Sequence, residues 1–284
     1  MSPGLSAVNY LGFVALGFGI GAYGTLIGAG GGFILMPLLL LMHPQENPDR
    51  LTAISLAVVF ANALSGSAAY ARMKRIDYRS GLMFAAAAVP GAIVGALQIS
   101  RVSRGLFNII FSVVIILVAA VMVLRPNLEH NPRGDYPLSR WETKRCLVEA
   151  NGAGHVWTFY PVIGIVLSFF VGYFSSFLGI GGGIIHVPAL VWFLHFPVHI
   201  ATATSHFILA IMALAGTLVH VWTGALAQGW QETLGLGLGV LLGAQLGAYW
   251  SNRVKSAWII RSLAFALGLV GIRILITSLK PLGL

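Results

Sequence analysis

The sequence predicts an all-α fold: a polytopic membrane bundle of two homologous helical repeats. Composition is the first observation, because 57% of the 284 residues are hydrophobic and only 9% are charged, whereas soluble domains carry about 25% charged residues. Second, residues 150–231 form a run of 82 without Asp, Glu, Lys or Arg. As a helix that run would measure roughly 120 Å, so it must cross a hydrocarbon core about 30 Å thick several times. Third, GAGGGFILMP at residues 28–37 returns as GIGGGIIHVP at residues 179–188.

Eight apolar segments have the length of a spanning helix, which is about 20 residues. They lie at residues 5–27, 51–71, 80–100, 105–124, 158–178, 200–224, 233–252 and 257–279. A shorter apolar stretch follows the first segment of each set, at residues 32–42 and 183–196. Because eleven residues of helix reach only ~16 Å, we expect each short stretch to be a half-helix or a re-entrant segment.

The two sets of segments are copies of one unit. Residues 28–39 and 179–190 are identical at seven of twelve positions, and TAIS at 52–55 corresponds to TATS at 202–205. The offset between matching positions stays between 150 and 152 residues. The predicted division is a first transmembrane repeat at 1–124, a connection at 125–157 and a second repeat at 158–284. Lys and Arg counts do not separate inverted from parallel copies, but a shared transport site at the midplane favours inversion.

The net charge of +9 comes from short basic clusters between apolar segments, such as RMKR at residues 72–75. This pattern is typical of the positive-inside bias of cytoplasmic loops and not of a nucleic-acid surface. We therefore place RMKR and the connection 125–157 on the cytoplasmic side, and expect a short surface helix in the connection. The single cysteine, Cys146, excludes an internal disulfide. Because the first residues lack a basic n-region, we expect the first apolar segment to be retained as a membrane helix.

Four glycines in five residues at membrane depth need a physical reason, because an unpaired backbone N–H or C=O in hydrocarbon costs several kcal/mol. One interpretation is close helix–helix contact through small residues. The other is that the glycines unwind the chain, so that bare N–H groups at a helix N-terminus face a bound anion. Duplication favours the second, since two such helix ends can meet between the repeats. The predicted binding glycines are Gly30, Gly31, Gly32, Gly181, Gly182 and Gly183, and Gly28, Pro37, Gly179 and Pro188 complete the structural motif.

All eight carboxylates lie in connections or at segment ends. Cation pumps and proton relays place Asp or Glu inside the membrane, so this distribution favours an anion held by neutral dipoles. The candidate polar partners that follow the two breaks are Thr52, Ser55, Asn62, Thr202 and Ser205. Hydroxyls at helix starts also act as caps or bond their own backbone, and that alternative stays open for each of them.

Histidine is the only side chain here that can titrate near neutral pH inside the membrane. His206 adjoins the TATS hydroxyls, and we expect it to bind the anion or to carry a proton. His186, after the second glycine run, is another candidate proton carrier. His195 and His199 have the spacing of metal ligands on one helical face, but Pro197 between them argues against a helix, so no metal is predicted. No Walker A motif occurs, and no cofactor is predicted.

The duplicated G-x-GGG-x-x-x-x-P element, followed by TAIS and TATS, resembles the sulfite exporter TauE/SafE family, also called the 4-toluene sulfonate uptake permease family. The resemblance covers nearly the whole chain. It implies a multi-pass carrier in the bacterial inner membrane for sulfur-containing or organic anions such as sulfite, sulfoacetate or related sulfonates. Only the glycines and prolines of the two elements match the family motif, so the resemblance implies a functional role for these residues alone. The connection and the histidines of the second half lie outside the motif.

Residues and resemblance together predict a secondary transporter of a small, sulfur-containing anion, which works by alternating access in a lipid bilayer and could assemble as a homodimer. An anion channel, or a membrane protein without a transport role, is the alternative. An intramembrane enzyme is the least supported class. It would need Ser65 or Ser67 paired with a base, for which His206 and His220 are the candidates, and no G-x-S-x-G motif occurs.

Overall fold

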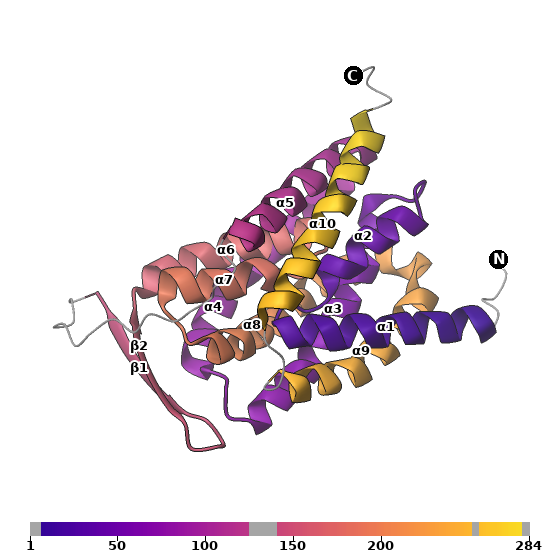
Figure 1. Cartoon of the computed structure of the whole chain (residues 1–284). Coiled ribbons are helices and arrows are strands. Elements are labelled where there is room, and N and C mark those ends of the chain that lie inside the picture. Colours follow the sequence, from indigo (N-terminus) through magenta and orange to yellow (C-terminus); the bar gives the residue numbers. More distant parts are fainter. Residues whose placement is uncertain (1–6, 125–140, 252–255, 280–284) are drawn as a thin grey trace.

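The computed structural model of the chain describes residues 7–124, 141–251 and 256–279 and consists of a helical bundle with one hairpin at its edge (Figure 1). The long helices are α1 (Ala7–Ile27), α3 (Pro48–Arg72), α4 (Tyr78–Gln98), α5 (Arg104–Leu124), α6 (Pro161–Leu178), α8 (Val198–Trp222), α9 (Trp230–Trp250) and α10 (Ser256–Leu279). The short helices are α2 (Gly32–Met42) and α7 (Gly183–Leu194), with 3-10 turns η1 (Ile99–Arg101) and η2 (Ala225–Gln228). Among the described residues, seven of these long helices have the length and composition to cross a membrane. The predicted polytopic helical bundle is confirmed, and the observed helix bounds lie within three residues of the expected ones.

Helices of the two halves of the chain pack in corresponding ways. α1 lies along α9 and α4 lies along α6, while α3 packs against α8 and α5 against α10. Figure 1 shows α5 and α10 side by side. When α1–α5 are matched in order with α6–α10, the contact of α1 with α9 corresponds to that of α6 with α4. The other two contacts, α3 with α8 and α5 with α10, each join a helix to its own counterpart. α3 and α8 are the most deeply buried spans, so the centre of the bundle lies between them.

Stripes of glycine bring these helices into backbone contact. A Cβ at Gly239, Gly243 or Gly247 of α9 would lie 2.1 Å from a carbonyl oxygen of α1. At the equivalent contact, a Cβ at Gly172 of α6 would lie 2.2 Å from the carbonyl oxygen of Ala88 in α4. No side chain fits at these distances, so these glycines serve the close helix–helix packing of small-residue interfaces.

Each short helix runs back toward the end of the bundle at which the preceding long helix begins. α1 starts beside the start of α9, around Gly235, and α2 ends there too, because His43 lies 3.6 Å from Glu232. α7 ends at the opposite end, where Phe196 packs on Trp157, just before α6. The two halves thus enter the bundle from opposite ends, which favours inverted over parallel repeats.

The described part of the connection, which begins at residue 141, is a β-hairpin and contains no helix. β1 (Thr143–Val148) pairs antiparallel with β2 (Gly154–Phe159), and the hairpin lies outside the bundle in Figure 1. Burial alternates from residue to residue along β1, which is the period of a strand. Gly152, at φ 87°, allows the chain to reverse between the strands. Residues 125–140 of the connection lie outside the described residues.

The hairpin lies at the same end of the bundle as the RMKR loop, as predicted. The amide of Ala150 donates to the carbonyl oxygen of Met73 at 3.0 Å. The guanidinium of Arg75 binds the carboxylate of Glu149 at 2.7 Å. We call this the hairpin end, and we call the opposite end, which carries residues 43–50 and 229–233, the network end.

Candidate functional site: two glycine breaks and a polar cluster

The first glycine run is a true break between α1 and α2. Gly28, Gly30 and Gly31 have φ values of 84°, 77° and 78°, a left-handed region that favours glycine. The first helical bonds of α2 run from the amides of Ile34 and Leu35, and both end on the carbonyl oxygen of Gly31. The amides of Gly28 and Gly30 bond carbonyl oxygens at the end of α1, so the open donors of the α2 N-terminus are those from Gly31 to Phe33.

The second glycine run repeats this geometry between α6 and α7. Gly179, Gly181 and Gly182 have φ values of 67°, 71° and 32°. The amides of Ile185 and His186 both bond the carbonyl oxygen of Gly182, as the equivalent amides do in the first break. The duplicated motif therefore builds the same local structure twice, as the sequence predicts.

The two breaks touch each other inside the bundle. A Cβ at Gly183 would lie 2.6 Å from the carbonyl oxygen of Gly28. A Cβ at Gly32 would lie 2.7 Å from the carbonyl carbon of Ile180. Both breaks are buried. Gly32 and Gly183 therefore serve close packing, as the first interpretation of the glycines predicts.

The predicted hydroxyls flank the breaks symmetrically, but some already bond the backbone. A Cβ at Gly28 would lie 2.6 Å from Cγ2 of Thr202, and one at Gly179 would lie 2.6 Å from Cγ2 of Thr52. The Thr52 hydroxyl donates to a carbonyl one turn earlier in its own helix, and Ser55 donates to the carbonyl oxygen of Gly179 at 2.5 Å. Ser205 differs, because its buried hydroxyl has no hydrogen-bond partner among the described residues.

A cluster of buried polar side chains lies beside the first break. The hydroxyl of Thr25 donates to Oδ1 of Asn62 at 3.1 Å, and the hydroxyl of Tyr70 donates to the carbonyl oxygen of Thr25 at 2.8 Å. The ring of His206 meets Tyr70 edge-on, with centroids 5.5 Å apart. We call Thr25, Asn62, Tyr70 and His206 the polar cluster.

Several polar atoms at this place have no hydrogen-bond partner within the described part of the chain. They include Nδ2 of Asn62 and both ring nitrogens of His206. A buried polar group without a partner costs about 1–3 kcal/mol. Such groups inside a bundle are therefore candidates for ligand contact.

The sequence analysis identified Asn62 and His206 but missed Thr25 and Tyr70. A repeat comparison at the same offset pairs Thr25 with Ser176, and this pair of hydroxyls before the two breaks could have pointed to Thr25. Tyr70 carries no such signal, because its phenol reaches Thr25 only through the packing of α3 on α1.

At the position of His206 in the polar cluster, the other half carries an apolar residue. A Cβ at Gly66 would lie 2.7 Å from the ring of His206, and the repeat-related Cβ at Gly216 would lie 3.1 Å from Leu56. His206 and Leu56 therefore occupy equivalent places in the two halves. The histidine makes one half polar where the other is apolar.

His186, the second candidate proton carrier, lies in α7. It is buried, and its Nε2 lies 3.1 Å from the hydroxyl of Ser168 in α6. Pro37 and Pro188 lie inside α2 and α7 respectively, so both short helices continue past their prolines. In the described ranges, no group of three His, Cys, Asp or Glu side chains could hold a metal.

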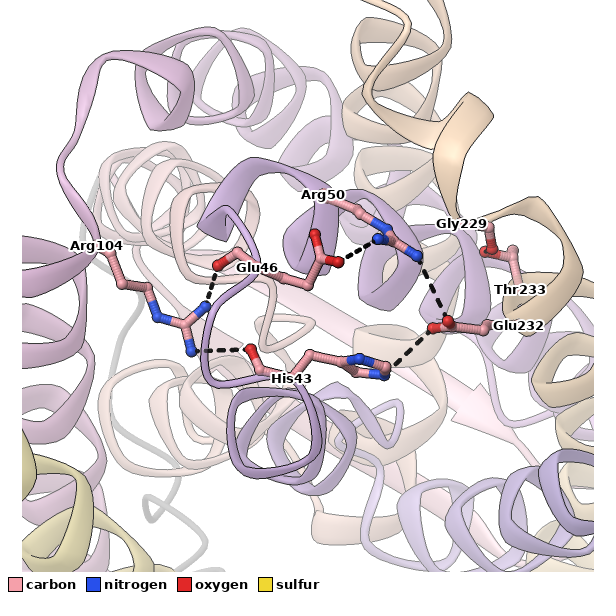
Figure 2. Close-up of polar contacts among 7 residues, drawn as sticks. All are labelled: His43, Glu46, Arg50, Arg104, Gly229, Glu232 and Thr233. Carbon is pink, nitrogen blue, oxygen red and sulfur yellow. Dashed lines mark hydrogen bonds and ion pairs between the residues drawn. The ribbon is translucent and has the colours of Figure 1, made fainter. Parts of the chain in front are cut away.

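The network end is closed by ionic and hydrogen-bonded contacts (Figure 2). Arg50 of α3 lies 2.6 Å from the carboxylate of Glu46 and 3.5 Å from that of Glu232 in α9. His43 reaches Glu232 from the end of α2. Arg104, at the start of α5, donates to the carbonyl oxygens of Glu46 and His43. This network joins both halves of the chain.

The hairpin end is closed by the connection. Trp157 and Phe159 of β2 pack on Phe196, with ring centroids 5.0 and 5.2 Å apart. The carboxylate of Glu149 binds both Arg75 and His155, at 2.7 and 2.9 Å. The breaks thus lie buried between two closed ends.

A family model described as "Sulfite exporter TauE/SafE" matches residues 13–274. "Probable membrane transporter protein YunE" of Bacillus subtilis (strain 168) is 28% identical over 276 residues, which are 94% of this chain and 98% of the relative. A "Probable membrane transporter protein" of Xylella fastidiosa (strain Temecula1) is 26% identical over 74% of each chain. A relative from Methanocaldococcus jannaschii is 24% identical over 73% of this chain and 71% of its own. No solved structure matches the chain.

Proposed function

This chain belongs to the sulfite exporter TauE/SafE family, and we propose that it is a secondary transporter of a small, sulfur-containing anion. It is a multi-pass membrane protein of a transporter family. The assignment of an anion rests on one observation: the two glycine breaks meet inside the bundle beside buried polar atoms without partners. Sulfite, sulfoacetate and related sulfonates are the proposed solutes, and the bacterial inner membrane is the proposed location.

Recognition of an anion follows from the donors at the breaks. The N-terminus of α2 and that of α7 each present early amides and the positive end of a helix dipole. Asn62 and His206 add side-chain donors beside the first break. Because a sulfonate or sulfite carries several acceptor oxygens on one tetrahedral or pyramidal group, converging neutral donors suit it. Ser205 and Thr202 complete the proposed binding set with Gly31, Gly181 and Gly182.

The transport cycle would be alternating access. We infer that the conformation described above is occluded, because the breaks are buried and contacts close both ends. Release of the network end would open one side, and release of the hairpin end the other. Rocking of inverted repeats around a fixed site accomplishes this in other carriers. His206 and His186 are the proposed proton carriers if transport is proton-coupled.

Uptake of radiolabelled sulfite into liposomes that contain the purified protein tests the proposal. Gly31→Leu and Gly182→Leu should abolish uptake, because each puts a branched side chain at a left-handed glycine. Gly19→Leu is the matched control, since a Cβ at Gly19 meets nothing within 4 Å. Normal uptake by both break variants would exclude the assigned binding role. A panel of sulfonates in a thermal-shift assay then identifies the solute, because a ligand that binds only the folded state raises its stability.

The same preparation separates the alternatives. A carrier saturates and shows counter-flow, whereas a channel passes solute without counter-flow. For an intramembrane protease, a serine would need a base. The hydroxyl of Ser65 donates to the carbonyl oxygen of Leu241 at 2.7 Å and accepts from Gln245. Ser67 has no hydrogen-bond partner among the described residues. Neither serine is therefore paired with a general base within the described part of the chain.

A further inference from the structure

An open pocket of about 410 Å³ lies at the hairpin end, away from the glycine breaks. It is bounded by the last turn of α3, the turn of the hairpin and the last turns of α9. The polar residues that line it are Arg72, Arg75, Glu149, Asn151, Gln245 and Tyr249. The pocket therefore brings together both halves of the chain and the connection between them.

Positive charge exceeds negative charge in this lining, since Arg72 and Arg75 face a single carboxylate. Arg75 is bound to Glu149 through Nε at 2.7 Å, and only 6% of its side chain is exposed. Its Nη1 has no hydrogen-bond partner among the described residues. A buried guanidinium donor without an acceptor costs free energy that a bound anion would recover.

Arg72 supplies the uncompensated charge of the pocket. Its guanidinium lies 3.4 Å from the amide oxygen of Gln245, a neutral group. The amide nitrogen of Gln245 is already used, because it donates to the carbonyl oxygen of Ser65 at 2.8 Å. The amide therefore turns its oxygen toward Arg72 and holds the guanidinium beside the pocket.

The position of the pocket indicates which anion it meets. α3 and α9 both end here, and Tyr249 and Trp250 at the end of α9 are 54% and 47% exposed. Exposed Tyr and Trp at the end of a spanning helix lie at the headgroup level of a bilayer. Basic pockets between membrane helices on the cytoplasmic side bind anionic headgroups.

We propose that this pocket binds a phosphate group, supplied by an anionic phospholipid headgroup, with Arg72 and Arg75 as its ligands. A phosphate there would contact the end of α3, the hairpin turn and the end of α9 at once. Lipid binding would therefore stabilise the closed hairpin end. The inference does not depend on which solute the protein carries.

The test is thermal stability of the purified full-length protein in neutral detergent. Phosphatidylglycerol, phosphatidylcholine and inorganic phosphate are titrated separately into the wild type and two variants. Arg72→Gln removes the uncompensated cation. Arg79→Gln is the control. It removes an equal charge at the same end of the bundle, but its side chain is exposed and lies outside the pocket. Both positions are exposed, so both variants should fold.

We expect phosphatidylglycerol to raise the melting temperature of the wild type and of Arg79→Gln. The apparent affinity of Arg72→Gln should be about tenfold lower, as the loss of one charge-assisted hydrogen bond predicts. Stabilisation by inorganic phosphate alone, with the same dependence on Arg72, would identify a soluble phosphate as the source and keep the site. Equal losses in the two variants, or no stabilisation by either phosphate source, would overturn the proposal.

Discussion

Nη2 of Arg50 lies 3.5 Å from the carboxylate of Glu232, and this contact joins α3 of the first half to α9 of the second. Both side chains are largely buried, with exposed fractions of 19% and 12%. The carboxylate of Glu46 lies 2.6 Å from Nη1 of the same guanidinium, so Arg50 pairs with two carboxylates (Figure 2). An ion pair that crosses between halves has to break if these halves move apart at the network end.

Glu232→Gln should weaken this closure. We expect the loss of the charge on Glu232 to lower the free energy of unfolding by about 1–3 kcal/mol, because Arg50 keeps only Glu46 as its counter-ion. Thermal denaturation in detergent measures this change. Arg50→Gln in the Glu232→Gln background should cost less than in the wild type, and strictly additive costs would show that the two side chains do not interact. Arg101→Gln, an exposed change at the same end, is the control.

Gly30→Ala and Gly181→Ala should destabilise the breaks. Both glycines have left-handed φ angles, and a Cβ at Gly30 would lie 2.2 Å from the side chain of Leu209. The backbone conformation alone costs an alanine about 1–2 kcal/mol. The matched control is Gly237→Ala in α9, whose Cβ meets nothing within 4 Å. It should be neutral or stabilising, because alanine is the better helix former. Equal melting temperatures for all three variants would contradict this prediction.

His206→Leu should separate stability from transport. Leu56 occupies the repeat-related place, so a leucine is already accommodated in that geometry in the other half. The substitution removes two buried ring nitrogens without partners, so we expect the melting temperature to stay the same or rise. Sulfite uptake into liposomes should nevertheless be lost. A variant that melts normally and transports normally would remove His206 from the proposed site.

Trp157→Ala should loosen the hairpin from the bundle. Trp157 is buried against Phe196, and truncation of a buried tryptophan costs about 3–5 kcal/mol. Hydrogen exchange of the hairpin amides should accelerate together with a lower melting temperature. Val156→Ala is the control, because this neighbour on the same strand is 49% exposed. If both variants exchange at the wild-type rate, the ring contact does not hold the hairpin in place.

Much of the fold is predictable from local properties of the chain. Spanning helices depend on hydrophobicity and length, since a backbone in hydrocarbon has to satisfy its own hydrogen bonds. The breaks were predictable because glycine is the residue that adopts left-handed angles at little cost, and Gly28, Gly30 and Gly31 do so. The hairpin was harder to predict, because charged residues dominate the connection and its strands are marked only by a short alternation that ends in the buried Trp157 and Phe159.

Less of the candidate site was predictable. Thr52 and Ser55 lie beside Gly179 of the second break, and only their geometry reveals that their hydroxyls bond backbone carbonyls. Tyr70 entered the polar cluster through helix packing, which leaves no local trace in the sequence. The role of the remaining polar residues as ligands of an anion stays a prediction.

By itself, the sequence determined that this protein is a membrane bundle, where its helices lie and where two of them break. These features follow from hydrophobicity and from glycine, which act within a few residues. Only the tertiary structure decided that the breaks touch, that Arg50 meets Glu232 and that His206 lies opposite Leu56 in the other half. Such contacts join residues that are distant in the chain, and the packing of whole helices sets them.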